Sequence, residues 1–214
     1  MYTPSSFKET DPKTLFDFIE ANSFGILFSQ HGDRAEATHL PFLVDRNRDK
    51  QGVLIAHFAK ANKHWRRIST EQDVLCVFHG MHGYITPAWY HDRVTVPTWN
   101  YASVHVTGTP TIIDDPEWLR KAVVRLTHFH EAHTESDWDL SEGESTIPVE
   151  LKAIIGLEIE ITHIEGKFKF NQNRSTEDQH SVIEHAKRHP DEHYKQMGAW
   201  MGQNLADKKE TNRK

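Results

Sequence analysis

The segment VPTWNYASVHVTGTPTII, residues 96 to 113, decides the fold prediction because a polar start leads into a long strand pattern. Thr, Val and Ile recur in it, and such β-branched residues favour a strand, which we place at residues 98 to 113. Its first residues carry hydroxyl, indole and amide groups, at Thr98, Trp99 and Asn100. Such groups either bind a ligand or satisfy a neighbouring loop.

A second polar stretch, KFKFNQN at residues 167 to 173, raises the same question. In an extended chain Lys167 and Lys169 share one face and the two phenylalanines share the other. A row of amides that includes Gln172 follows, which suits recognition of the edge of a heterocycle but also satisfies loop backbones. Two such stretches in one chain indicate a bound ligand.

Short strands and a few helices surround these stretches. Asp11 and Asp115 are predicted helix N-caps, each followed by proline at the first helical position, and Ser175 begins a third helix. Shorter strands are predicted at residues 24–29, 36–44, 53–58, 74–80, 84–90 and 156–166. Pro41 cannot donate a ladder hydrogen bond, so we expect an edge or a bulge there.

The order of these elements predicts a fold that is mainly β with flanking helices. Many short strands joined by tight turns are typical of a small antiparallel barrel with helices packed on its rim. We expect residues 1–174 to form this domain and residues 175–214 to form a helical extension packed on it.

The composition indicates the cellular compartment in which the protein works. Cys76 is the single cysteine of the 214 residues, so no disulfide can form within the chain, which fits a reducing cytoplasm. Neither a signal pattern at the start nor an apolar run long enough to cross a membrane is present. We therefore expect a cytoplasmic protein without membrane contact.

The charge balance makes direct nucleic-acid binding doubtful. The formal net charge is -6 with the 16 histidines neutral, whereas nucleic-acid binders carry a basic surface. Local basic stretches do occur, KHWRR at residues 63–67 and KKETNRK at residues 208–214. They keep a directly DNA-binding regulator open as an alternative.

The stretch AHFAKANKH, residues 56 to 64, has features that suit a phosphate. A strand is expected to end and a helix to begin inside it, and a helix N-terminus offers unpaired N–H groups. Lys60 and Lys63 add positive charge, while His57 and Asn62 add neutral donors. From this stretch alone, a solvated basic turn is the simpler interpretation.

Other aromatic and histidine-rich stretches give weaker signals. Tyr84 and its aromatic neighbours at 89 and 90 suit the wall of a flat ligand, or ordinary packing at a barrel rim. The histidines of LTHFHEAH, residues 126 to 133, lack the H-E-x-x-H spacing of a zinc helix, so no metal site is predicted. No nucleophile or general base stands out, and the catalytic residues stay unknown.

Taken together, these stretches resemble one known family. The resemblance runs from Met1 to about Arg174 and is carried by the motifs MYTPSSF, ATHLPF, AHFAKANKHW, VFHGMHGYITPAWY, VPTWNYASVHVTG, LTHFHE, IIGLEIEI and EGKFKFNQN. In this order they are similar to the PaiB-like family, described as FMN-binding negative transcriptional regulators.

The resemblance implies a flavin-binding split β-barrel that forms a homodimer with FMN in grooves at the interface. The turn after the third strand of such barrels holds the FMN phosphate, and the second strand offers backbone groups to the isoalloxazine. The cofactor-binding residues it implies or favours are Thr38, His39, Leu40, His57, Lys60, Asn62, Lys63, Tyr84, Trp99, Asn100, Tyr101, Lys167 and Gln172.

Three functions remain open at this point. The first is an FMN-binding protein of the regulator type with flavin-dependent oxidoreductase activity, since flavin carries the hydride chemistry and needs no general base from the protein. The second is a DNA-binding regulator without catalysis. The third is a haem-binding split barrel, because some split barrels bind haem and this chain is rich in histidine.

Overall fold

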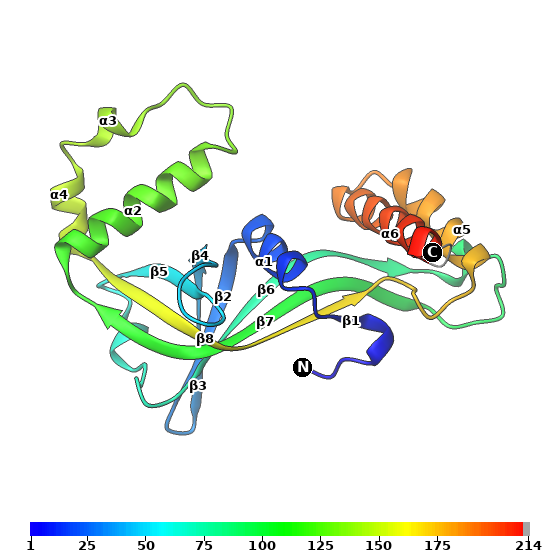
Figure 1. Cartoon of the computed structure of the whole chain (residues 1–214), viewed down its shortest axis with the longest axis horizontal. Coiled ribbons are helices and arrows are strands. Elements are labelled where there is room, and N and C mark those ends of the chain that lie inside the picture. Colours follow the sequence, from blue (N-terminus) through cyan, green and yellow to red (C-terminus); the bar gives the residue numbers. More distant parts are fainter. Residues whose placement is uncertain (212–214) are drawn as a thin grey trace. The chain divides into compact units, whose positions relative to one another are not determined.

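The computed structural model describes the backbone of residues 1–211 and the side chains up to residue 207. The predicted fold class is confirmed, because one mainly antiparallel sheet carries flanking helices (Figure 1). Its strands are β1 Lys8–Glu9, β2 Phe24–His31, β3 Arg34–Pro41, β4 Leu43–Asp45, β5 Val53–Ala59, β6 Val74–Ile85, β7 Thr98–Ile113 and β8 Ile154–Lys169. The helices are α1 Pro12–Ala21, α2 Pro116–Glu131, α3 Leu140–Gly143, α4 Ile147–Glu150, α5 Thr176–Lys187 and α6 Glu192–Thr211. Short 3-10 turns are η1 Ser5–Phe7, η2 Lys63–Arg66, η3 Pro87–Trp89 and η4 Leu151–Ala153.

The sheet closes into a barrel through one bent strand. The hydrogen-bonded order is β3-β2-β6-β7-β8-β5-β4, and β3 and β4 are separated only by Phe42. Pro41 ends β3, and the next amide, that of Phe42, donates to the carbonyl oxygen of Ser23 at 2.8 Å. The chain therefore changes its strand partner after Pro41, because β3 pairs with β2 and β4 pairs with β5. This change fits the edge or bulge expected at Pro41. Large side chains that fill this core include Leu27, Phe42, Leu54, Phe58, Phe78 and Ile159.

The chain divides into two compact units. The barrel unit comprises residues 16–78 and 105–164, and the terminal unit comprises residues 1–15, 79–104 and the described chain from 165 onward. Strands β6, β7 and β8 contribute residues to both units. Residue 175, where the sequence predicts a domain boundary, is the N-cap of α5 and lies within the terminal unit.

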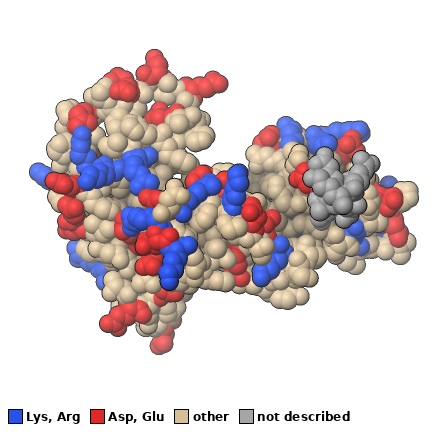
Figure 2. Space-filling model, viewed as in Figure 1, with Lys and Arg blue, Asp and Glu red and all other residues tan. Residues whose placement is uncertain are grey.

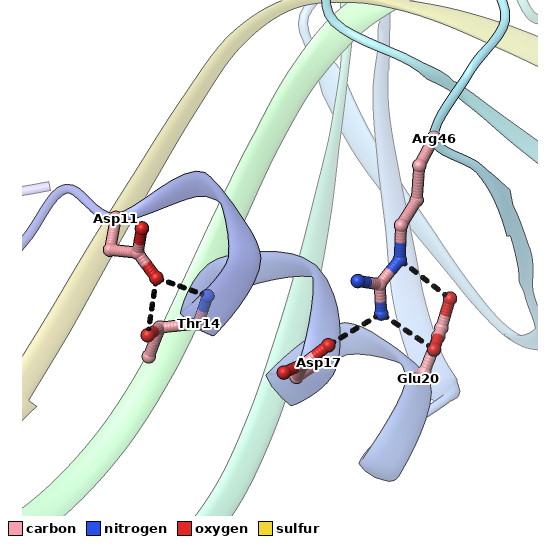
Figure 3. Close-up of polar contacts among 5 residues, drawn as sticks. All are labelled: Asp11, Thr14, Asp17, Glu20 and Arg46. Carbon is pink, nitrogen blue, oxygen red and sulfur yellow. Dashed lines mark hydrogen bonds and ion pairs between the residues drawn. The ribbon is translucent and has the colours of Figure 1, made fainter.

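Helix α1 begins where the sequence predicts. The Asp11 carboxylate accepts hydrogen bonds from the Thr14 amide at 2.8 Å and from its hydroxyl at 2.7 Å, which caps the first turn (Figure 3). Further along the helix, Arg46 donates to both Asp17 and Glu20, each 2.7 Å from its Nη2 atom (Figure 3). This ion pair ties α1 to the loop that follows β4.

Helix α2 begins at the predicted cap and packs on the outer face of the barrel. The Asp115 side chain accepts from the amides of the helix's first turn, and Pro116 occupies the first helical position. Ala122 of α2 packs on Val53 and Ile55 of β5, and Trp118, Leu126 and Phe129 surround this contact. The apolar stripe of the helix thus covers one outer strip of the sheet.

Three sequence expectations differ from the structure. The strands predicted at 74–80 and 84–90 form one continuous strand, β6, followed by η3, because Gly80 and Gly83 keep ordinary extended backbone and do not turn the chain. The strand predicted at 156–166 continues to Lys169 as β8. The helix expected inside AHFAKANKH is only the 3-10 turn η2, too short for a helix dipole to build up.

In the terminal unit, α5 and α6 lie side by side (Figure 1). Ser175 caps α5 as predicted, accepting from the Asp178 amide at 3.1 Å. Phe168 and Phe170 are buried, and the Trp200 ring of α6 lies 5.5 and 4.6 Å from their ring centres. The last part of the basic tail, residues 212–214, lies outside the described residues. None of the described helices combines the length and apolarity needed to cross a bilayer.

Candidate functional site

The barrel unit brings together Thr38 and Asn62 of the predicted set. Both contact His64, which is fully buried: its Nδ1 lies 2.7 Å from the Thr38 hydroxyl, and Asn62 accepts from its backbone amide at 3.0 Å. The other ring nitrogen, Nε2, lies 2.8 Å from the Ser29 hydroxyl. Burial lowers the pKa of His64, so the ring is neutral near pH 7, with one nitrogen donating and the other accepting. We call this contact between β3 and η2 the β3–η2 seam.

The two lysines expected at a phosphate have different surroundings. The Lys60 ammonium forms an ion pair with Asp114 at 2.8 Å, so part of its charge is already compensated. Lys63 is exposed at the start of η2, and within the described residues its ammonium has no ion-pair partner. Lys63 is therefore a cation available to an anion near the seam.

The residues predicted on the second strand of the barrel unit, which is β3, differ in where their side chains point and offer backbone groups as well. Leu40 points into the core, while His39 is exposed and stacks on Phe24 with ring centres 6.0 Å apart. Strand β3 ends the hydrogen-bonded order, so one line of its peptide groups has no strand partner in the described part of the chain. These peptide groups can serve a heterocycle edge, as expected for Thr38 to Leu40.

The structure places His57 away from the seam. Neighbouring residues of a strand point to opposite faces, and Phe58 contacts the His64 ring at 5.7 Å. His57 therefore faces outward, where it lines a cavity with residues of α2, α3 and α4. The structure does not bring His57 together with Thr38, Asn62 and Lys63.

In the terminal unit, the predicted aromatic residues Tyr84 and Trp99 come together. Their ring centres are 6.0 Å apart in an edge-on arrangement, and both side chains are exposed. Lys169 fixes the start of β7, since its ammonium donates to the Trp99 carbonyl at 2.8 Å and also contacts the Thr98 hydroxyl. Burial, with help from neighbouring cations, lowers the pKa of Lys169. Two flat rings, one from β6 and one from β7, are thus presented to solvent.

Lys167 and Tyr101 contact each other rather than solvent. The Lys167 ammonium lies over the Tyr101 ring at 5.2 Å and over the Tyr2 ring at 5.6 Å. It also donates to the Tyr2 carbonyl at 3.0 Å, and the residue is buried. Lys167 therefore holds the N-terminal segment to β8 and offers no free charge.

The side chain of Gln172 is hydrogen-bonded within the protein, and the side chain of Asn100 is buried. The Gln172 amide accepts from the Phe170 amide at 2.7 Å and donates to the Phe168 carbonyl at 2.5 Å, so it closes the loop after β8. Asn100 is fully buried, and neither of its side-chain polar atoms has a partner among the described residues. An unpaired buried amide is costly, so Asn100 marks a place where a water or a rearranged contact would be stabilising.

Sequence reasoning missed the groove beside the seam. It has a volume of about 320 Å³ and is lined by His31, Arg34, Glu36 and Arg67. Arg67 pairs with Glu36, and this contact holds the pKa of the carboxyl below its usual range. Arg34 and Glu36 are two residues apart on β3, so the alternation of side chains along a strand indicates that they share a face. Only the fold shows that η2 faces them.

Comparison with known proteins identifies the family. Residues 1–163 match the family model described as "Putative FMN-binding domain". The chain belongs to this family. It is also 33% identical over 207 residues to "Protease synthase and sporulation protein PAI 2" of Bacillus subtilis, covering 96% of this chain and 98% of that protein. The resemblance to the PaiB-like family is thereby confirmed, and FMN is the cofactor of the domain.

Solved structures confirm the split-barrel fold. The flavocytochrome Anf3 from Azotobacter vinelandii is 14% identical with a TM-score of 0.55, covering 76% of this chain and 69% of that chain. The FAD and heme binding protein from Mycobacterium smegmatis is 16% identical with a TM-score of 0.54, covering 76% and 73%. At these identities the likeness concerns the fold alone.

The exposed groups of this chain fit FMN. Lys63 supplies an uncompensated cation for a phosphate, and the open edge of β3 supplies peptide groups for the ring system. Trp99 and Tyr84 supply flat rings suited to stacking. The protein is therefore a flavin-binding split barrel. Within the barrel unit His39 and Lys63 are exposed and Thr38 and Asn62 are half-buried, and within the terminal unit Tyr84 and Trp99 are exposed.

Proposed function

We propose that the protein is a homodimeric, FMN-dependent oxidoreductase. The observation that carries this proposal is that the uncompensated Lys63 directly precedes the buried, neutral His64 of the β3–η2 seam, beside an open strand edge. FMN, when bound, accepts and delivers hydride or electrons, and the protein supplies position and electrostatics. The family match supports the cofactor part of the proposal.

Each side chain has a defined part in this proposal. Lys63 neutralises the phosphate, with Lys60 as a weaker contributor because Asp114 shares its charge. Thr38 and Asn62 are positioning residues, held by the buried His64 so that η2 keeps one geometry. The backbone of β3 at Thr38 to Leu40 meets the isoalloxazine edge, and Trp99 and Tyr84 serve as ring contacts or dimer contacts.

The phosphate assignment can be tested by FMN titration of the purified protein. Lys63→Ala is expected to weaken FMN binding about tenfold or more, the order expected for one charge-assisted contact. Lys60→Ala is expected to weaken it less. Lys50→Ala is the matched control, because Lys50 is an exposed lysine of the same unit in the turn before β5. Fluorescence quenching of FMN gives the affinity, and an unchanged affinity in Lys63→Ala would refute the assignment.

The oxidoreductase part needs a separate measurement. FMN-loaded protein should oxidise a reduced nicotinamide under air, with the loss of absorbance at 340 nm as the readout. Lys63→Ala should lower the rate at limiting FMN and recover it at saturating FMN, because the variant affects cofactor binding alone. A loaded protein that consumes no reduced nicotinamide would exclude this class of electron donor.

A regulatory effect, in this proposal, is indirect and passes through the flavin. The basic stretch KHWRR does not form one basic surface: His64 is buried, Arg67 is paired with Glu36, and the Arg66 guanidinium lies over the Trp65 ring. On the face in Figure 2, basic and acidic side chains are interspersed. The absence of a salt-sensitive gel shift at low salt would support an indirect effect, and its presence would contradict it.

Haem binding is a second candidate that one observation favours. His82 lies in a cluster of rings in the terminal unit, 4.8 Å from His79, 4.4 Å from His193 and 6.5 Å from Trp99 between ring centres. Two structures with this fold are named for haem as well as flavin. A Soret band on haem titration that is lost in His82→Ala would establish this function, and its absence would exclude it.

A further inference from the structure

A cavity lies beneath the helical segment that connects β7 to β8. This segment contains α2, α3, α4 and η4, and it runs beside the barrel (Figure 1). Its helix α2 covers the outer face of β5 through the contact of Ala122 with Val53 and Ile55. His57 continues the same outward row, two residues beyond Ile55. Next to the contact of Ala122 with Val53 and Ile55, the helical segment leaves an open volume above the His57 side chain.

This cavity has the size and lining of a small-molecule site. Its volume is about 320 Å³, within the range typical of such sites. Its walls are mainly apolar and come from α2, α3, α4 and the ends of β5 and β8; they include Val123, Leu140, Ile147 and Ile154. Ile147 is itself buried, which fixes α4 against the cavity. A preformed apolar volume of this kind favours an apolar ligand.

Five side chains with hydrogen-bonding groups line this mainly apolar volume. The Thr146 hydroxyl already donates to the Gly143 carbonyl at 2.8 Å, and Glu150 carries a carboxylate. The other three groups are the imidazole of His57, the hydroxyl of Thr127 and the indole N–H of Trp138. None of the three makes a hydrogen bond to any other group in the described part of the chain. Burial lowers the pKa of His57, so its ring is neutral near pH 7 and offers one donor and one acceptor. His57 and Thr127 are half-buried, and half-buried polar groups without protein partners are stabilised when a ligand supplies the missing partner. Trp138 is exposed, so its indole N–H is open to water or to a ligand.

The lining also restricts the charge of the ligand. Neither lysine nor arginine lines the cavity within the described residues, and Glu150 places a carboxylate at its wall. An anion would therefore meet repulsion without a compensating cation, which excludes the phosphate of a flavin from this cavity. The flat indole of Trp138 suits a planar partner.

We propose that this cavity binds an uncharged aromatic molecule of one or two rings that carries a hydroxyl or carbonyl group, hydrogen-bonded to His57. This site is separate from the β3–η2 seam and does not depend on the proposed flavin function. Strand β5, which carries His57, leads into the turn before η2, and the Lys60 amide of this turn donates to the Ala153 carbonyl of η4 at 2.7 Å.

The proposal is tested with 2-naphthol, an uncharged, fluorescent, two-ring probe with a hydroxyl group. We expect one molecule to bind per chain, with naphthalene about tenfold weaker because it lacks the hydrogen bond and naphthalene-2-sulfonate not binding. Isothermal titration with FMN-free protein gives the affinities. Failure of 2-naphthol to bind at millimolar concentration, or equal binding of the sulfonate, would overturn the proposal.

Variants place the probe within the cavity. His57→Phe keeps an aromatic volume and should weaken 2-naphthol binding about tenfold, while Thr127→Val is isosteric and tests the second polar group without disturbing the fold. Val123→Trp fills the volume and should abolish binding. Glu117→Ala is the control, since Glu117 lines the neighbouring cavity beside Lys60. Unchanged binding in both His57→Phe and Val123→Trp would place the probe elsewhere and refute the site.

The flavin and cavity sites can be distinguished in the same samples. Lys63→Ala should weaken FMN and leave 2-naphthol binding unchanged, whereas Val123→Trp should do the reverse. If the protein binds no FMN at all, the 2-naphthol result still stands on its own. Loss of 2-naphthol binding in Lys63→Ala would show one shared site and contradict the proposal.

Discussion

At the scale of residues, one hydroxyl of the terminal unit satisfies two backbone groups. Tyr194 of α6 accepts from the Tyr84 amide at 2.9 Å and donates to the Tyr84 carbonyl at 3.0 Å. The ring approaches so closely because residue 83 is glycine: a Cβ there would lie 2.6 Å from the Tyr194 ring. The contact fixes α6 to the part of β6 that carries an exposed aromatic ring.

We expect Tyr194→Phe to lower the free energy of unfolding by about 1–3 kcal/mol, because two backbone groups lose their partner. Gly83→Ala should destabilise through the steric clash instead. Urea denaturation followed by circular dichroism measures both. Tyr84→Phe is the matched control, since it also removes a tyrosine hydroxyl but leaves the two bonds between the Tyr194 hydroxyl and the backbone of residue 84 in place. Equal effects of Tyr194→Phe and Tyr84→Phe would contradict this account.

At the scale of elements, the buried His64 joins β2, β3 and η2 through Ser29, Thr38 and its own backbone. Its pKa is lowered by burial, as are those of His57 and His79. The unfolded chain therefore takes up protons at a higher pH than the folded protein. The contribution of these histidines to the free energy of unfolding is fully present above the ordinary histidine pKa of about 6.5. It is lost as the pH falls toward the lowered pKa values of the folded protein.

We accordingly expect the melting temperature to fall between pH 7 and pH 5, before the carboxylates titrate. His64→Gln keeps hydrogen-bonding groups and removes a titrating ring, so it should flatten this pH dependence while costing about 1–3 kcal/mol at pH 7. Exposed His31 gives the control, because His31→Gln makes the same exchange of histidine for glutamine at the surface of the same unit. A His64→Gln profile parallel to that of the wild type would show that other groups cause the acid loss.

The elements also show what the sequence can predict. Helix starts at Asp11, Asp115 and Ser175 are local, because a cap depends on residues three positions apart, and all three were predicted correctly. The break predicted in β6 was wrong, because glycine permits a turn without requiring one. His64 was missed as a site residue because its partner Ser29 is 35 residues away, and only closure of the barrel brings the two together.

At the scale of the whole molecule, exposed apolar side chains point to a partner. Val94 and Val96, in the connection between β6 and β7, are 93% and 70% exposed, and Trp99 and Tyr84 are 55% and 42% exposed. The rings of Tyr84 and Trp99 also contact each other, and exposed apolar patches mark surfaces that bind a partner. The resemblance to flavin-binding split barrels gives a specific expectation, a second copy of this chain.

We expect wild-type protein to have the mass of a dimer in size-exclusion chromatography with light scattering. Trp99→Asp should shift it to a monomer, because burying an unpaired carboxylate at an apolar interface is costly. Val149→Asp is the control, as Val149 is 65% exposed on α4, outside this region. FMN titration of the same variant separates the two roles of Trp99. If the variant remains a dimer but loses FMN, Trp99 is a ligand contact. If the variant becomes a monomer, Trp99 is an interface residue. A dimer with unchanged FMN affinity contradicts both roles.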